Sequence, residues 1–203
     1  MSPDTTALIL IGYQNDYYRS DGVLHGYLEG SEYVRRSLAT TLTLLGRLAP
    51  TTVTMIETPI VFTDDYSELR DPVGILAAIR DMKAFRAGQP GSARVQELDP
   101  YRERILSVPG KRGMNAFVGT RLDEELRQRR IRDIVLLGSV ASICIDSTGR
   151  SAAERGYRVH FVSDCITGRT LVELDLYLKT IFPLYGQVIS SSELIDQLCG
   201  THV

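Results

Sequence analysis

Two short apolar runs constrain the fold of this chain more than any other feature of its sequence. Residues 6–11 read TALILI and residues 134–137 read IVLL, without the polar alternation of a half-exposed strand. Strands of this kind are buried on both faces, as in parallel sheets covered by helices. Further β-prone runs alternate along the chain with segments of helical periodicity. The sequence therefore predicts a three-layer, doubly wound α/β fold, with a mainly parallel sheet of about six strands and helices on both faces.

The turn residues and the periodicity give approximate bounds for each element. Strands are expected at residues 6–11, 59–63, 104–108, 134–137, 158–162 and 187–189. Another β-prone run, 52–56, precedes the second of these, and we expect at least residues 59–63 in the sheet. Helical spacing predicts helices over residues 31–49, 73–85, 122–130, 144–155, 170–182 and 192–198. No linker rich in Pro, Gly or Ser divides the 203 residues, so one domain, residues 1–203, is expected.

Charge and cysteine usage exclude several classes of partner. The formal net charge is −2 and no element carries a cluster of Lys and Arg, so nucleic-acid binding is not expected. No apolar stretch is long enough to span a bilayer, and the N-terminus lacks the regions of a signal peptide. The three cysteines are odd in number and far apart, which argues against a disulfide framework. We expect a cytoplasmic protein that binds no membrane.

Cys144 stands where the second apolar run ends and a helix is expected to begin. Helix N-termini carry unpaired backbone N–H groups and partial positive charge, and both favour a thiolate over a thiol. The alternative is that Cys144 is simply a small buried apolar residue, as free cysteines often are. The local pattern alone leaves both interpretations open.

Other chemistry-bearing residues follow the expected strands. In doubly wound folds ligands bind outside the carboxyl ends of the strands, which here brings Lys111 toward Cys144. Lys111 is then either a solvated surface lysine or an ammonium that accompanies the thiolate. Residues 139–142 form either an ordinary loop or a turn whose backbone N–H groups bind an oxyanion. The three histidines lack metal-binding spacing and no Gly-rich phosphate loop is present, so neither metal nor cofactor is expected.

Four ordered blocks resemble the motifs of one family. Residues 7–17 read ALILIGYQNDY, similar to an opening strand followed by D-x-Q-N-D-F. Lys111 with residues 115–117 is similar to a K…S-A-F block, and residues 138–145, GSVASICI, are similar to G-V-A-T-D-V-C-V. Residues 154–164 match the helix end and strand that follow. Over nearly its whole length the chain resembles the isochorismatase-like cysteine hydrolases, the superfamily of nicotinamidases, carbamoylsarcosine amidohydrolases and ureidoacrylate hydrolases.

This resemblance implies a Cys–Lys–Asp site. Cys144 would be the nucleophile and Lys111 the activating cation, while the backbone N–H groups of Val140 and Cys144 would form the oxyanion hole after a cis peptide bond, Ser139–Val140. The implied reaction is hydrolysis of a C–N bond (amide or carbamoyl) or an ester bond of a small-molecule substrate, through a covalent acyl intermediate. The family also implies a homo-oligomer, a dimer or a tetramer.

Two departures from the family pattern limit what the resemblance implies. The family's catalytic aspartate, the general base, falls on Gly12, which has no side chain. Its replacement is expected to be Asp65, with Asp64, Glu57 and the substrate itself as alternatives. Nicotinamidases carry an Asp and several His ligands after the second strand. Here Ser67 stands in place of the first His, so we expect no metal there and do not expect nicotinamide as the substrate.

The predicted pocket residues and the predicted function each have an alternative interpretation. Gly12, Tyr17, Asn115 and Phe117 are predicted to line the pocket because they flank the catalytic blocks, although each could instead serve packing. The main functional alternative is a catalytically altered or inactive family member that acts as a small-molecule binder or an interaction subunit, and Gly12 is its support. A vinyl-ether hydrolase is disfavoured, because such enzymes use an aspartate and need no cysteine.

Overall fold

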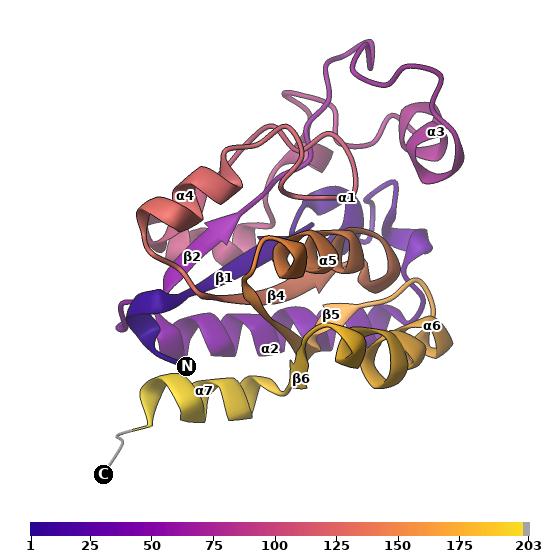
Figure 1. Ribbon diagram of the computed structural model, residues 1–203. Helices are drawn as coiled ribbons and strands as arrows, with labels where there is room; N and C mark the ends of the chain where they lie inside the picture. Colours follow the sequence, from indigo (N-terminus) through magenta and orange to yellow (C-terminus); the bar gives the residue numbers. More distant parts are fainter. Residues whose placement is uncertain (201–203) are drawn as a thin grey trace.

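A computed structural model describes residues 1–200 of the protein (Figure 1). One sheet runs through it, with strand order β3-β2-β1-β4-β5-β6 and every neighbouring pair parallel. The strands are β1 (Thr6–Ile11), β2 (Thr54–Glu57), β3 (Ile105–Ser107), β4 (Asp133–Ser139), β5 (Arg158–Thr167) and β6 (Gln187–Ile189). The predicted fold class is confirmed.

Helices cover both faces of this sheet. They are α1 (Asn15–Tyr18), α2 (Ser31–Leu48), α3 (Gly74–Asp81), α4 (Leu122–Gln128), α5 (Asp146–Glu154), α6 (Leu171–Leu176) and α7 (Ser191–Cys199). Figure 1 shows α2 and α7 below the sheet and α4 and α5 above it. Helix α3 stands apart from the sheet, within the long connection between β2 and β3. Within residues 1–200, no helix combines the length and apolar composition needed to cross a membrane.

The two apolar runs form the centre of the sheet. Every residue of β1 and β4 is buried, and the two strands pair in register from Thr6 with Asp133 to Ile11 with Gly138. The chain adds β2 and β3 on one side of β1 and then returns to add β4, β5 and β6 on the other side. The carboxyl ends of β1 and β4 therefore meet where the direction of winding reverses, which is where such folds bind their ligands.

Residues 59–63 do not form the strand that we expected. The sheet uses β2 instead, and Ile60 and Phe62 make only isolated bridges, to Lys111 and Arg86. Pro59 lacks the N–H that a continuing ladder needs. The amide and carbonyl of Ile60 are taken by the side chain of Gln14, at 2.9 and 2.7 Å. The chain thus leaves the sheet after Glu57, earlier than its β-prone composition suggests.

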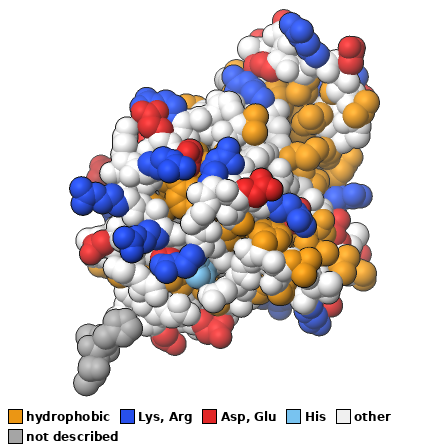
Figure 2. Space-filling view, viewed as in Figure 1, with side chains coloured by type: hydrophobic (Ala, Val, Ile, Leu, Met, Phe, Trp, Pro, Cys, Tyr) orange, Lys and Arg blue, Asp and Glu red, His pale blue; other side chains and the backbone are white. Residues whose placement is uncertain are grey.

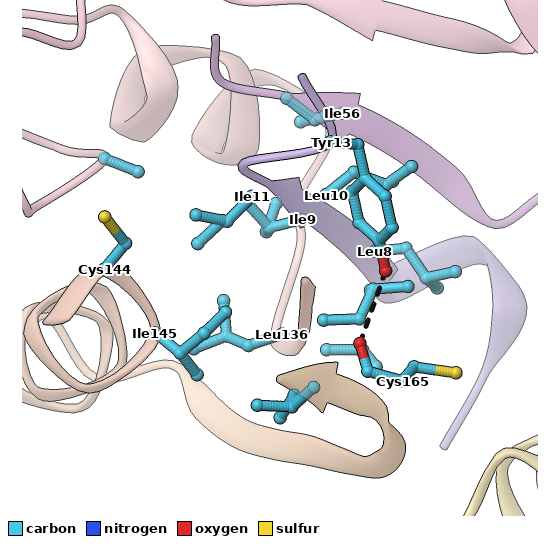
Figure 3. Packing of buried hydrophobic residues seen from close by; sticks show 14 of the residues in the cluster. Leu8, Ile9, Leu10, Ile11, Tyr13, Ile56, Leu136, Cys144, Ile145 and Cys165 are labelled. Atoms are coloured by element: carbon cyan, nitrogen blue, oxygen red, sulfur yellow. Dashed lines mark hydrogen bonds between the residues drawn. The ribbon is translucent and has the colours of Figure 1, made fainter. Parts of the chain in front are cut away.

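Cys165 lies in the core on the α2 side of β1. Figure 3 shows the Tyr13 hydroxyl donating to the Cys165 carbonyl, at 3.3 Å, and a second hydrogen bond at 2.8 Å joins this hydroxyl to Thr41. Burial raises the pKa of the Cys165 thiol to about 12. This cysteine is therefore an inert core residue at neutral pH.

A charged cluster fastens the amino ends of β4 and β5. Asp133 is buried, and its carboxylate accepts hydrogen bonds from Arg158 and, at 3.0 Å, from Nε2 of His160. Burial is the largest single influence and would raise the pKa of Asp133, but the hydrogen bonds and charges of Arg158 and His160 together outweigh it and lower the pKa below its ordinary value. Asp133 therefore stabilises the fold above the ordinary carboxyl pKa, and this contribution is lost as the pH falls through the lowered pKa.

Replacing Asp133 by Asn should reduce both stability and its acid dependence. We expect the free energy of unfolding at pH 7 to fall by about 2 kcal/mol, because charged hydrogen bonds at a buried site are lost. The wild-type protein should also lose more stability than Asp133→Asn between about pH 5 and pH 2. Urea unfolding at several pH values measures both effects. Asp21→Asn, at an exposed ion pair with Arg19, is the control and should change little. Equal acid dependence in wild type and Asp133→Asn would contradict the assignment.

Candidate active site

Cys144 lies in a single π-helical turn, Ala141–Ile145, between the end of β4 and the start of α5. The amides of Ile143 and Ile145 both donate to the Val140 carbonyl at 3.1 Å, which closes the turn tightly. Figure 3 shows Ile145 directed toward Leu136 in the core, whereas the Cys144 side chain leaves the same turn in a different direction. Cys144 is only 3% exposed, so the turn holds it in a closed site.

The loop before this turn is fixed from both sides. The Ser139–Val140 peptide is cis, as the family resemblance implied. The Ser139 hydroxyl donates to Tyr18 at 2.9 Å and bonds the Thr167 hydroxyl at 2.7 Å. The amides of Val140 and Cys144 belong to this anchored stretch, and they remain the predicted donors to an oxyanion.

Lys111 reaches the cysteine from the other side. Its side chain is fully buried, and Nζ lies 3.3 Å from Sγ of Cys144 and 2.5 Å from the carbonyl oxygen of Gly113. The contact joins residues far apart in the sequence, and the sheet edge brings them together. Of the two interpretations of Lys111, a solvated surface lysine is thus wrong. An amine beside a thiol is one of the arrangements that can favour the thiolate of a nucleophilic cysteine.

A small cavity adjoins Cys144. Its volume is about 10 Å³, room for about one water molecule. The residues that line it, all within the described part of the chain, are Tyr17, Ile60, Phe62, Ile75, Leu76, Ile79, Gly113, Met114, Ile143 and Cys144. Burial, and then the nearby Cys144, raise the pKa of Tyr17 well above its ordinary value, so its hydroxyl stays protonated. The lining includes no carboxylate.

The predicted substitute bases lie elsewhere. Asp65 is exposed and accepts hydrogen bonds from the Thr63 hydroxyl, at 2.8 Å, and the Ser67 amide, at 3.1 Å; these bonds lower its pKa. Asp64 lies 3.3 Å from the Arg86 guanidinium, and Glu57 lies 3.5 Å from that of Arg94. None of these three carboxylates lines the Cys144 cavity.

Gly12 faces a different cavity. It has φ +73° and lines a space of about 200 Å³ together with Glu57, Thr58 and Arg94. A Cβ atom built at Gly12 would lie 2.8 Å from the Ser139 carbonyl oxygen. This backbone therefore does not accommodate the family's aspartate, for reasons of both conformation and space.

The other predicted pocket residues differ in whether they line the Cys144 cavity. Tyr17 lines the cavity, whereas Asn115 and Phe117 do not. The Asn115 side chain accepts from the Phe117 amide at 2.9 Å, and Phe117 is buried with the Arg155 guanidinium 4.7 Å from its ring centre. Both positions thus have the packing and turn role that was their alternative. No sequence motif indicated that α3 forms one wall of the Cys144 cavity. The one signal of this wall was apolar spacing at positions 75, 76 and 79, which also fits an ordinary core helix.

The described residues do not suit the metal site of nicotinamidases. No group of three or more His, Cys, Asp or Glu within residues 1–200 could hold a metal ion. Asp65 is occupied by Thr63 and Ser67, and His160 is occupied by Asp133. The absence of a metal stays a prediction for the protein in solution.

Comparison with known proteins places the chain in a family. A family model described as the isochorismatase domain matches residues 6–193. The chain belongs to the isochorismatase family. Among curated relatives it is 38% identical over 88 residues to the uncharacterized isochorismatase family protein YwoC of Bacillus subtilis, an alignment that covers 43% of this chain and 47% of that protein. The chain therefore spans about half the length of such curated relatives.

Solved structures confirm the fold over a longer range. A cysteine hydrolase from Pseudomonas syringae pv. phaseolicola superposes with a TM-score of 0.86 at 21% identity, covering 97% of this chain and 93% of that one. A nicotinamidase from Bacillus subtilis superposes with a TM-score of 0.76 at 21% identity, covering 92% and 99%. At this level of identity the likeness establishes the fold.

The Gly12→Asp substitution should not simply restore the family pattern. We expect it to lower the free energy of unfolding by about 1–3 kcal/mol, because the new side chain needs a left-handed backbone and meets the Ser139 carbonyl. Gly26→Asp is the matched control, since nothing lies within 4 Å of a Cβ at that exposed position. Chemical unfolding measures the difference between the two variants. Equal stabilities would show that position 12 tolerates a carboxylate.

Proposed function

We propose that this chain is a cysteine hydrolase that cleaves a C–N bond (amide or carbamoyl) or an ester bond of a small molecule, through an acyl intermediate on Cys144. One observation supports this proposal above all others: Sγ of Cys144, which adjoins a small cavity, lies 3.3 Å from Nζ of the buried Lys111 at the reversal point of the sheet. A hydrolase of this type needs an activated thiol, an oxyanion site and exclusion of bulk water.

In the proposed reaction, Sγ of Cys144 attacks the substrate carbonyl carbon. The carbonyl oxygen becomes an oxyanion, which the amides of Val140 and Cys144 stabilise. The tetrahedral intermediate collapses, and the amine or alcohol leaves with one proton. Water then attacks the thioester carbon, the carboxylic or carbamic acid departs, and the thiol regains its proton.

Lys111 is the group best placed to carry that proton. Its Nζ lies within hydrogen-bond distance of the Cys144 sulfur, and the other polar contact of Nζ is the Gly113 carbonyl oxygen, which cannot accept a proton. In the proposed reaction the thiol proton moves to Lys111 as Sγ attacks, and it then passes to the leaving group. Tyr17 stays protonated and cannot be the base. Asp65 has less support, because its oxygen is occupied by Thr63 and Ser67.

The second candidate function is a binder or interaction subunit that performs no hydrolysis. The observation in its favour is the backbone at Gly12, which has no room for the family's general base. The two functions differ in whether substrate carbonyls become covalently attached to Cys144.

A panel of small amides, carbamoyl compounds and esters tests the proposal directly. Hydrolysis should depend on Cys144, and intact-protein mass spectrometry of a slow ester should reveal one acyl adduct on it. Cys144→Ala should lose at least on the order of 10³-fold in rate and form no adduct. Cys199→Ala removes an exposed cysteine and should retain full activity. If no member of the panel is turned over or forms an adduct, the binder hypothesis is preferred.

Substitutions of Lys111 distinguish the effect of its positive charge on Cys144 from its role in proton transfer. Lys111→Arg keeps a cation that does not release its proton, so Cys144 should still be alkylated by iodoacetamide while hydrolysis falls by about 10²–10⁴-fold. Lys111→Met removes both properties, and alkylation and hydrolysis should both fall. Lys179→Met, at an exposed ion pair with Asp175, is the control and should change neither. Substantial hydrolysis by Lys111→Arg would assign the proton to another group.

Domain organisation, compartment, cofactor use and assembly are further parts of the proposal. We propose a single domain that acts in the cytoplasm without a cofactor, and the three free cysteines agree with a reducing compartment. A homo-oligomer, dimer or tetramer, is supported by apolar side chains exposed on α6 and after it: Val172, Leu176 and Leu184. Figure 2 shows hydrophobic side chains gathered along this side of the molecule. Sedimentation velocity that finds only a monomer would contradict this assembly.

A further inference from the structure

We infer that the substrate carries a small, uncharged, apolar group beside its scissile carbonyl, and that the inner face of α3 forms the pocket for that group. The inference rests on the proposed function and adds a substrate class to it. It follows from what surrounds Cys144, from how α3 is attached and from where the cavity opens.

The wall around Cys144 is aliphatic and aromatic. Apart from the cysteine, Gly113 and the Tyr17 hydroxyl, its lining is Ile60, Phe62, Ile75, Leu76, Ile79, Met114 and Ile143. A charged substrate group in this space would lose its hydration and find no partner. The cation beside Cys144, Lys111, already contacts the Cys144 sulfur and the Gly113 carbonyl. The lining therefore selects against carboxylates and ammonium groups next to the reacting carbonyl.

Helix α3 closes this space. Ile75, Leu76 and Ile79 lie on one face of the helix, and Ile79 is almost fully buried. With a volume of about 10 Å³ the cavity holds about one water molecule, so a substrate has to displace these side chains before it reaches Cys144. The inner face of α3 thus becomes a substrate contact as soon as the site is occupied.

The attachment of α3 suits such a displacement. Figure 1 shows the helix standing apart from the sheet, and it belongs to the long connection between β2 and β3. Positive φ angles occur near both ends of the helix: at Asp71 before it, at Gly74, its first residue, and at Lys83 after it. Short segments near element ends are where changes in backbone angle are absorbed when an element moves.

Met114 marks the entrance. It lines the cavity and is also 41% exposed, so it lies between solvent and Cys144. Val73, directly before α3, is 81% exposed. In Figure 2 hydrophobic side chains cover the side of the molecule where α3 lies. The approach to the site is thus apolar, as is its interior.

Two alkylating reagents of equal length test this preference without relying on hydrolysis. N-propyl-2-iodoacetamide and N-(2-hydroxyethyl)-2-iodoacetamide are both neutral and differ by one methyl group against one hydroxyl group. Their rates at Cys144 are measured by peptide mass spectrometry. The exposed Cys199 of the same chain gives the intrinsic ratio of the two reagents. We expect the propyl-to-hydroxyethyl ratio at Cys144 to exceed that at Cys199 by about tenfold.

Variants test whether the apolar residues that line the cavity cause the preference for the propyl reagent. Leu76→Ser should bring the ratio at Cys144 down toward the ratio at Cys199, and Met114→Ser provides a second, more exposed variant in case the first does not fold. Val23→Ser, at an exposed valine that does not line the Cys144 cavity, should leave the ratio unchanged. Equal ratios at Cys144 and Cys199 in the wild type would overturn the inference, and an unchanged ratio in Leu76→Ser and Met114→Ser would overturn the role of this wall.

The outcome is separable from that of the proposed function. A high propyl preference without turnover of any amide, carbamoyl compound or ester contradicts the hydrolase and leaves the apolar pocket intact. Turnover with equal alkylation ratios supports the hydrolase and contradicts the pocket.

Discussion

A fully buried lysine needs partners for its amine, and in this protein Lys111 has two: the sulfur of Cys144 and the carbonyl of Gly113. The first comes from the turn that follows β4, and the second comes from Lys111's own loop. The contact persists only while the sheet edge keeps these two segments together. The closed π-helical turn, the anchored Ser139 and the central pairing of β1 with β4 all contribute to that placement.

The sequence predicted the parts of the molecule that follow from local physics. The unbroken apolar runs predicted β1 and β4, and hence a parallel sheet with its site at their carboxyl ends. The places of Lys111 and Cys144 after expected strands predicted that the two lie close together, and the motif resemblance then gave them their expected roles. Residues 59–63 were misplaced, because the Gln14 side chain takes the backbone groups of Ile60. That competition is tertiary and has no signature in a single strand's composition.

The site itself was only partly predictable for a similar reason. Tyr17 was expected in the pocket and lines it, but Asn115 and Phe117 lie beside the catalytic blocks in sequence without lining the cavity. Proximity along the chain is a poor guide where loops turn sharply. The wall from α3 comes from a segment outside every motif, and its apolar spacing is that of any helix with one buried face.

The left-handed backbone at Gly12 has a consequence for protein engineering. A Cβ atom at this position would lie against the Ser139 carbonyl, and the backbone angle disfavours any residue that carries one. Exchange of the residue alone therefore cannot introduce a relaxed carboxylate here. A design that places an acid at position 12 has to remodel the backbone of its loop together with that of Ser139.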